Sequence, residues 1–183
     1  MCRKKRCRWC NEDNPLYLRY HDCEWGIPCF EDSYLFEMLI LESFQAGLSW
    51  ECVLNKRENF KSAYDGFDLD AVCSYGEEKV ESLLSNPGLI RNKLKIRASI
   101  NNALIYKKIV VEYGSFYDYL KQFTEGKTFF EIGRATNELS DAISKDLKMR
   151  GMKFVGSTII YSYLQAIGVI YSHDEECFLH KGN

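Results

Sequence analysis

Apolar positions along the chain recur with a helical period more often than with the alternation of a strand. Between residues 33 and 46, one helical face carries Leu35, Met38, Leu39, Glu42 and Ala46. Gly47 provides a C-terminal stop, and Ser49 is a typical N-cap for a second helix that extends to about residue 64. The pattern therefore predicts an all-α fold.

Further helical periods are predicted at residues 77–84, 92–113, 115–123, 141–149 and 157–167. The β-branched stretch at 109–111 lies inside one of these periods and is interpreted as helix. With 183 residues, 46% of them apolar, and only three prolines, the chain can bury one sizeable core and shows no linker between domains. We expect a single domain over residues 1–183, with a helical core at about 33–170.

The overall charge gives no sign of a polyanionic partner, because the formal net charge is −2 and the sequence pI is about 6.0. The basic N-terminus is not followed by an apolar stretch, and no apolar run approaches membrane-spanning length. We expect a protein of the reducing cytoplasm that has no membrane segment. In that compartment the eight cysteines would serve as metal ligands or core residues rather than as disulfides.

Soft metal ligands gather at the two ends of the chain, at Cys2, Cys7, Cys10, His21, Cys23, His173, Cys177 and His180. His173 and Cys177 are four residues apart and would face the same way on a helical turn. The spacing of Cys7 and Cys10 is that of a zinc knuckle, so spacing favours Cys7, Cys10, His173 and Cys177, with His21 competing for the place of Cys10. The alternative is that these residues are unrelated.

A carboxylate at Glu42 falls on an apolar helix face, where a charge is costly unless it is paired or functional. Trp50 follows at the start of the next predicted helix, and a buried acid beside an indole could hold a flat cationic group. A second aromatic cluster comprises Trp9, Tyr17, Tyr20 and Trp25, and part of it could share one face of a short helix. In the alternative interpretation, Glu42 turns to solvent and the aromatic residues fill the core.

Six basic residues and no acidic one occupy the stretch from 91 to 108, at Arg91, Lys93, Lys95, Arg97, Lys107 and Lys108. A second basic group comprises Lys145, Lys148, Arg150 and Lys153, and it leads into a turn at 151–156 between two predicted helices. The backbone N–H groups of such a turn could bind one phosphate. An ordinary helical hairpin with a solvated rim is the alternative, because Phe154 stands where the generic DNA-binding hairpin has its first glycine.

Over nearly the whole chain, the sequence resembles the 3-methyladenine DNA glycosylase I family. The strings that carry the resemblance are CRW, PLYLRYHDCEWGIP, LFEMLILES, QAGLSW, KREN, LIRNKLKI and RGMKFVGSTIIYSYLQAIGV, followed by His173 and Cys177. The resemblance implies a helix-hairpin-helix glycosylase fold, with the hairpin near 148–167 and the N- and C-terminal segments joined by zinc.

The same resemblance implies roles for individual residues. One structural zinc per chain would be held by Cys7, His21, His173 and Cys177, which selects His21 over Cys10. The damaged base would be held by Glu42, Tyr20 and Trp50, with Trp9 and Tyr17 as further walls. Independently of the resemblance, the glycine-bounded turn and the basic stretches predict DNA contacts from Gly151, Lys153, Gly156, Ser157, Arg91 and Lys93. Leu48, in the turn between Glu42 and Trp50, could wedge into the duplex or only pack in the core.

The implied activity is monofunctional hydrolysis of the N-glycosidic bond of 3-methyladenine in alkylated double-stranded DNA, by base flipping, with the free base as product. A monomer of the base excision repair pathway is expected. Two departures from the family are Ser43 after the pocket glutamate and Ser172 before the first C-terminal histidine. The competing class is a zinc-stabilised DNA-binding protein without catalysis, and the presence of both Glu42 and Trp50 argues against it.

Overall fold

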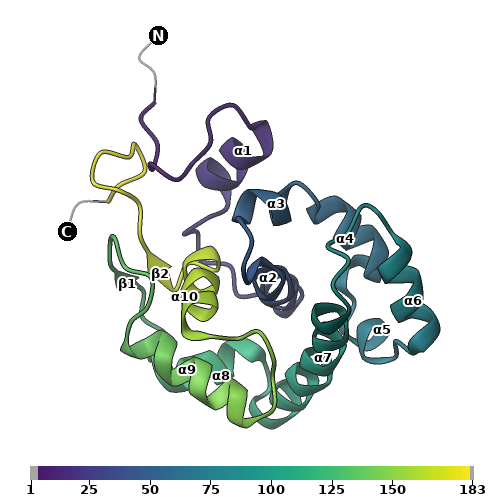
Figure 1. Ribbon diagram of the computed structural model, residues 1–183. Coiled ribbons are helices and arrows are strands. Elements are labelled where there is room, and N and C mark those ends of the chain that lie inside the picture. The colour runs from purple at the N-terminus through teal and green to yellow at the C-terminus, as the bar shows by residue number, and fades with distance from the viewer. Residues whose placement is uncertain (1–3, 182–183) are drawn as a thin grey trace.

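The computed structural model describes residues 4–181, and Figure 1 shows its helices arranged around the central helix α2. The helices are α1 (Pro15–Cys23), α2 (Asp32–Gln45), α3 (Trp50–Leu54), α4 (Arg57–Ala63), η1 (Asp65–Phe67), α5 (Leu69–Cys73), α6 (Glu77–Ser85), α7 (Lys93–Tyr113), α8 (Phe116–Thr124), α9 (Glu138–Met149) and α10 (Ser157–Ala166). The strands are β1 (Phe129–Phe130) and β2 (Ile170–Tyr171). The mostly helical fold agrees with the prediction from periodicity.

Helix α2 is central because it is apolar on nearly every side. Its residues 35, 36 and 38–44 are all buried, and it contacts α3, α7, α8 and α10. A helix with only one apolar face would lie at the surface instead. Glu42 and the end of α2 are therefore held inside a shell of other helices.

Side-chain caps fix where several helices begin, and the cap at Ser49 agrees with the prediction from the sequence. The Ser49 hydroxyl accepts from the Cys52 N–H, and the Asn92 side chain accepts from the N–H groups of Leu94 and Lys95. Helix α9 begins three residues before the predicted start because Asn137 and Ser140 form a reciprocal capping box there. Such caps satisfy donors that the first helical turn leaves unpaired.

The single helix predicted from Ser49 to about residue 64 is wrong, because two short helices, α3 and α4, occupy this stretch. The break falls at Asn55 and Lys56, whose side chains bond outside the helix. Asn55 Oδ1 accepts from Asn14, and Lys56 Nζ donates to the carbonyl of Pro87. Helical periodicity continues across the break and therefore gave no sign of it.

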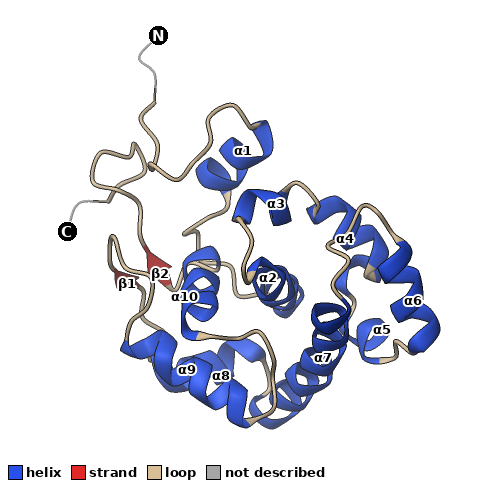
Figure 2. Cartoon of the chain, viewed as in Figure 1, coloured by secondary structure: helices blue, strands red, loops and turns tan. Residues whose placement is uncertain are grey.

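The prediction of an entirely α-helical chain also needs correction, because β1 and β2 form a two-stranded parallel sheet (Figure 2). Phe129 pairs with Ile170, and Phe130 with Tyr171. Strands of two residues are too short to produce a detectable alternation. The pairing places the loop after β1 beside the C-terminal segment that carries His173.

Gly168 allows the segment after α1 to pass close to the end of α10. A Cβ atom at Gly168 would lie 2.4 Å from the backbone nitrogen of Pro28, and the residue has a φ of +75°. The Gly26 N–H donates to the Gln165 carbonyl across this contact, and the Cys29 N–H donates to the Ile167 carbonyl. Since a side chain at 168 would clash, glycine is required for this approach.

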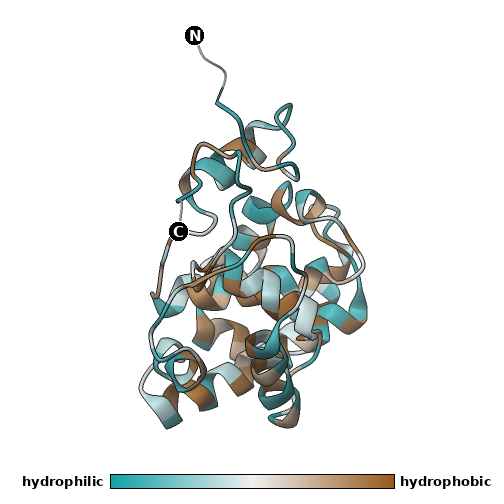
Figure 3. Cartoon of the chain, turned by 90° about the vertical axis from the view of Figure 1, so that its left-hand side faces the viewer, coloured by the Kyte–Doolittle hydropathy of each residue, from teal (hydrophilic) through white to brown (hydrophobic). Residues whose placement is uncertain are grey.

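Most helices combine apolar and polar residues, as the hydropathy colouring in Figure 3 shows. In the described part of the chain, no helix combines the length and the apolar character needed to cross a membrane.

Candidate functional site

Four buried Cys and His side chains from opposite ends of the chain meet in one cluster, and their ligand atoms all lie within 4.8 Å of one another. Cys7 Sγ lies 3.4 Å from His173 Nδ1, and Cys177 Sγ lies 3.5 Å from His21 Nε2. Around a tetrahedral zinc ion, nitrogen and sulfur ligands would be about 3.5 Å apart. The four residues therefore fit a tetrahedral metal ion with no position left open.

The surroundings of this cluster favour the forms of the side chains that bind a metal. Asp22 Oδ1 lies 2.8 Å from His21 Nδ1, so the other ring nitrogen faces the cluster. The Asp22 carboxylate also accepts two hydrogen bonds from Arg6, which lower its pKa. Burial lowers the pKa of His173 to about 4 and keeps the ring in its neutral, metal-binding form.

Cys10 lies outside the cluster, although spacing favoured it as a ligand. Its Sγ lies 3.9 Å from the carbonyl oxygen of Tyr17. His180 Nδ1 lies 3.2 Å from the carbonyl oxygen of His173, and Cys23 is exposed. Cys2 lies outside the described residues. The cluster contains His21 instead, as the family resemblance implied.

A cavity of about 310 Å³ lies beside this cluster, and its walls come from both ends of the chain and from the central helices. It is lined by Trp9, Tyr17, Tyr20, Trp25, Glu42, Gln45, Trp50, Gly133, Arg134, Ser162, Gln165, Ser172 and Asp174. All five predicted base-binding residues are in this set. The fold thus brings together side chains from α1, the end of α2 and the start of α3.

Aromatic rings form one continuous wall of the cavity. The ring centroids of Tyr20 and Trp50 are 5.2 Å apart, and those of Trp9 and Trp25 are 4.7 Å apart. The Trp25 ring also lies edge-on to His173, at a centroid distance of 4.7 Å. Because these rings pack against a cluster residue, the Cys/His cluster supports the cavity wall directly.

Three polar atoms at the cavity are buried and have no hydrogen-bond partner in the described part of the chain. They are Glu42 Oε2, Gln45 Oε1 and Trp50 Nε1. Glu42 is 2% exposed, and burial raises its pKa well above the usual value because it disfavours the charged form. Unpaired buried polar groups cost about 1–3 kcal/mol each, which indicates that a ligand completes them.

Several cavity residues were not among the predicted site residues. Gln45 follows Glu42 by three residues, and Ser162 precedes Gln165 by three, so helical spacing could have identified both pairs. Arg134 and Asp174 come from loops, whose positions periodicity does not predict. The Asp174 carboxylate accepts from the Arg8 N–H at 2.8 Å, which fixes it at the rim of the cavity.

The turn between α9 and α10 is held by side chains from neighbouring helices. Asn102 exchanges two hydrogen bonds with the backbone of Lys153, at 2.8 and 2.9 Å, and the Ser144 hydroxyl donates to the Val155 carbonyl at 2.7 Å. Gly156 caps α10 without any side-chain hydrogen bond to the first turn. The N–H groups at the start of α10 are therefore available to an anion.

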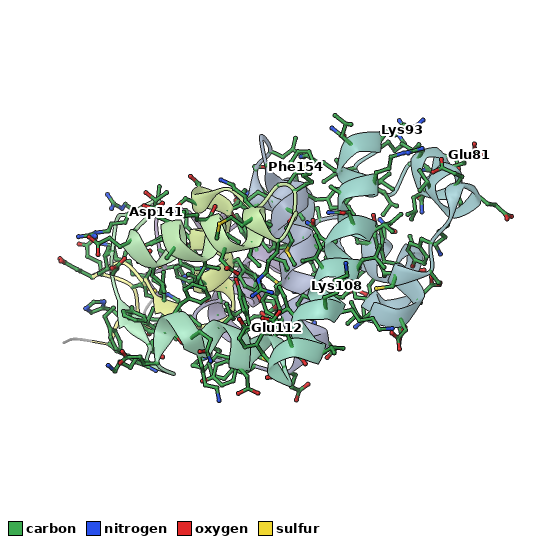
Figure 4. The ribbon with its side chains drawn as sticks, turned by 90° about the horizontal axis from the view of Figure 1, so that it is seen from below. Glu81, Lys93, Lys108, Glu112, Asp141 and Phe154 are labelled. Carbon is green, nitrogen blue, oxygen red and sulfur yellow. The ribbon has the colours of Figure 1, made fainter. Side chains whose placement is uncertain are left out.

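The predicted basic residues divide between the surface and the interior. Arg91, Lys93 and Lys153 are exposed, and in Figure 4 Lys93 projects to the same side of the molecule as Phe154. Lys95 is buried, although it belongs to the same basic stretch of the sequence. Arg97 pairs with Glu77, and Arg150 with Glu112 and Asp146.

Two further predicted residues have clear positions. Leu48 lies in the turn between α2 and α3 and is 41% exposed, so it does not fill the core. The Ser157 hydroxyl donates to the Asp141 carboxylate and lies 2.9 Å from the Ser140 hydroxyl. An anion at the start of α10 would thus meet backbone N–H groups more readily than this hydroxyl.

The sequence model of the methyladenine glycosylase family matches residues 9–180. The chain is 44% identical to DNA-3-methyladenine glycosylase 1 of Escherichia coli (strain K12), over 98% of each chain. It is 35% identical to DNA-3-methyladenine glycosylase of Haemophilus influenzae, over 94% of this chain and 96% of that relative.

Solved structures agree with these matches. A crystal structure of 3-methyladenine DNA glycosylase I is similar with a TM-score of 0.92 and 42% identity, over 97% of this chain and 100% of the other. A variant of 3-methyladenine DNA glycosylase I in complex with 3-methyladenine is similar with a TM-score of 0.91 and 32% identity, over 97% and 99%. Both sequence and fold are thus shared along the whole matched length.

Proposed function

We propose that this chain, which belongs to the methyladenine glycosylase family, releases 3-methyladenine from alkylated DNA by hydrolysing its N-glycosidic bond. The observation that carries the proposal is the buried, unpaired carboxyl of Glu42 in an aromatic cavity. A flat cationic base would supply both the donors and the charge that this group lacks.

In the proposed complex, the damaged base leaves the duplex and enters the cavity between aromatic rings. Trp50 stacks against a face of the base, and Glu42 and Tyr20 form hydrogen bonds with its edge. The positive charge of the alkylated base stabilises the ionised form of Glu42, which burial alone disfavours. An undamaged adenine is neutral and gains less from this contact, so the same pair of groups provides selectivity.

The chemistry needs modest catalysis because methylation already makes the base a good leaving group. The bond between C1′ of the sugar and the base breaks, and its electron pair leaves with the base and neutralises the positive charge. A water molecule adds its oxygen to C1′ and releases a proton. The cavity holds the base as the bond breaks, and only those contacts that strengthen in the transition state accelerate the step.

The proposed mechanism is monofunctional. No lysine lines the cavity among residues 4–181, so no amine is available there to form a covalent intermediate with the sugar. Water is therefore the proposed nucleophile.

We assign the turn between α9 and α10 as the hairpin of a helix-hairpin-helix motif that binds a DNA phosphate. Gly151, Lys153, Gly156 and Ser157 form the turn, Arg91 and Lys93 add positive charge, and Leu48 wedges into the space that the base vacates. These contacts would position any duplex, since phosphates carry no sequence information.

We assign zinc to the cluster of Cys7, His21, His173 and Cys177 on the donor set and its spacing. Four protein ligands leave no site for water, so the ion would have a structural role. Its role would be to hold Trp9 and Trp25 in the cavity wall by joining the two ends of the chain.

The direct test incubates the pure protein with methylated duplex DNA and separates the released bases by chromatography. We expect free 3-methyladenine as the main product, with the phosphodiester backbone left uncut until it is treated with alkali. Release of no base, together with retained duplex binding, would instead identify a DNA-binding protein without excision.

A further inference from the structure

Lys95 is a buried cation that the proposed reaction does not use. Its Nζ donates to the carbonyl oxygens of Phe44 at 2.8 Å and Ala46 at 2.6 Å, and the residue is 7% exposed. Its basic neighbours on α7, Lys93 and Arg97, are exposed. Removing an ammonium group from water is costly, so these two hydrogen bonds must compensate for its burial.

The two carbonyls that Lys95 binds lie at the C-terminal end of α2. A cation at this end of a helix satisfies otherwise unpaired carbonyl groups and opposes the negative end of the helix dipole. The turn that follows carries Leu48 and leads to Trp50, while Glu42 precedes it by less than two helical turns. Lys95 therefore holds the α2–α3 turn. This turn contains Leu48, the proposed wedge, and connects the cavity residues Glu42 and Trp50.

Helix α7, which carries Lys95, also holds the turn between α9 and α10. Asn101 Nδ2 donates to the Gly151 carbonyl at 3.0 Å, and Asn102 bonds to the backbone of Lys153 in both directions. The Phe154 ring centroid lies 5.9 Å from Lys95 Nζ, within cation–π range. Phe154 has a φ of +56°, a conformation uncommon for a bulky side chain.

We propose that Lys95 is a positioning residue that holds the α2–α3 turn, with Leu48, in register with the phosphate-binding turn between α9 and α10. This inference rests on the proposed function, because it concerns how that activity reaches a base inside a duplex. The turn between α9 and α10 would fix the DNA backbone, while the α2–α3 turn with Leu48 would meet the bases. Both contacts can form together only if the distance between these two turns is constant. A displacement of about 1 Å can cost on the order of a hundredfold in rate.

The test compares Lys95→Met, which keeps the length of the side chain and removes its donors and charge, with the wild-type protein. The substrate is methylated DNA, used as native duplex and after strand separation. Turnover on the duplex should fall on the order of tenfold to a hundredfold, with a smaller change in KM. Turnover on separated strands, where no base pair must be opened, should stay within about threefold of wild type, because the cavity is intact.

Two further variants control for general effects. Lys108→Met changes an exposed lysine about 20 Å farther along α7 and should leave both activities unchanged. Lys95→Arg retains a charge and donors and should recover most of the duplex activity. Amide hydrogen exchange in the DNA-free protein should accelerate at residues 46–50 in Lys95→Met, with α2 itself still protected.

Equal losses on duplex and separated strands would assign Lys95 a purely structural role and overturn the proposal, as would full activity of Lys95→Met on the duplex. If the wild-type protein releases no 3-methyladenine from either DNA form, the proposed function fails by itself. In that case amide hydrogen exchange still tests whether Lys95 holds the α2–α3 turn. Unchanged exchange at residues 46–50 in Lys95→Met would overturn this claim.

Discussion

The rings of Tyr20 and Trp50 lie with their centroids 5.2 Å apart and their planes inclined at 45°, next to the unpaired carboxyl of Glu42. The inclined rings provide two apolar surfaces in different orientations, and Glu42 and the Trp50 N–H provide polar groups without partners. A planar ligand with donors and acceptors on its edge can satisfy both sets of groups. Substitutions at these residues should therefore affect ligand binding more than folding.

Glu42→Gln should reduce 3-methyladenine release by on the order of tenfold to a thousandfold, the range for losing one polar contact to a reacting group. Glutamine has nearly the same shape but cannot carry the compensating charge. Single-turnover release from methylated duplex DNA measures the effect, and the exposed Glu81→Gln serves as the control. Normal release by a folded Glu42→Gln, Trp50→Ala double variant would falsify the assignment of the cavity.

The stability of the protein should also depend on pH through Glu42. Burial raises its pKa well above the usual 4.5, so the folded protein keeps a proton that the unfolded chain releases above this pH. The wild-type free energy of unfolding should therefore fall relative to that of Glu42→Gln as pH rises above 4.5, by at most about 1.4 kcal/mol per pH unit. Urea unfolding between pH 4 and 8 measures both proteins, and parallel curves would contradict the prediction.

Trp50→Ala should weaken the binding of free 3-methyladenine by about tenfold, because stacking on an aromatic face contributes about 1–3 kcal/mol per base. Trp50→Phe should lose less, since it keeps an aromatic ring, although that ring is smaller and lacks the unpaired N–H. Equilibrium dialysis with the free base gives the two affinities without any contribution from DNA. Equal binding by all three proteins would show that Trp50 only packs in the core.

His21→Ala should release the metal and lower the free energy of unfolding by at least about 3 kcal/mol, or roughly 6–12 °C in the unfolding midpoint of a chain of this size. Cys10→Ala should retain the metal and lose about 1 kcal/mol of packing. Elemental analysis should give about one zinc per chain in the wild type and in Cys10→Ala. Metal retained in His21→Ala but lost from Cys10→Ala would reverse the assignment.

Lys153→Ala and Arg91→Ala should weaken binding to all duplexes to a similar extent. Each should also reduce the slope of log K against log salt by about one, because each removes one phosphate contact. Fluorescence anisotropy across a salt series measures the slope, with Lys108→Ala as the control. Unchanged slopes in both variants would place the DNA-binding surface elsewhere.

Much of the fold could be predicted because helical periods are local. The long helices α2 and α7 and the cap at Ser49 are visible in the sequence. The β1–β2 pairing joins residues about forty positions apart through only two residues per strand, so no local pattern reveals it.

The candidate site was predictable where chemistry conflicts with periodicity, as at Glu42 on an apolar face. The gathering of the ligands Cys7, His21, His173 and Cys177 was expected from their position at the chain ends and from the family resemblance. Arg134 and Asp174 were missed because loops place them. Lys95 was grouped with the other basic residues of its stretch, although it shares a face with Asn102 and Tyr106, seven and eleven residues later, which are buried.

The position of Cys7 and Cys177 in one cluster also sets the order in which the molecule can be completed during synthesis. A ribosome makes Trp9, Tyr20 and Glu42 early, and the helices between them and α10 can fold as they emerge. His173 and Cys177 are made after all of these elements, so Cys7 meets its first partner from this segment only when synthesis has advanced 166 residues beyond it. A nascent chain that has not reached residue 173 therefore lacks both the Cys/His cluster and the contact between Trp25 and His173 that supports the cavity wall, even where its earlier helices have formed.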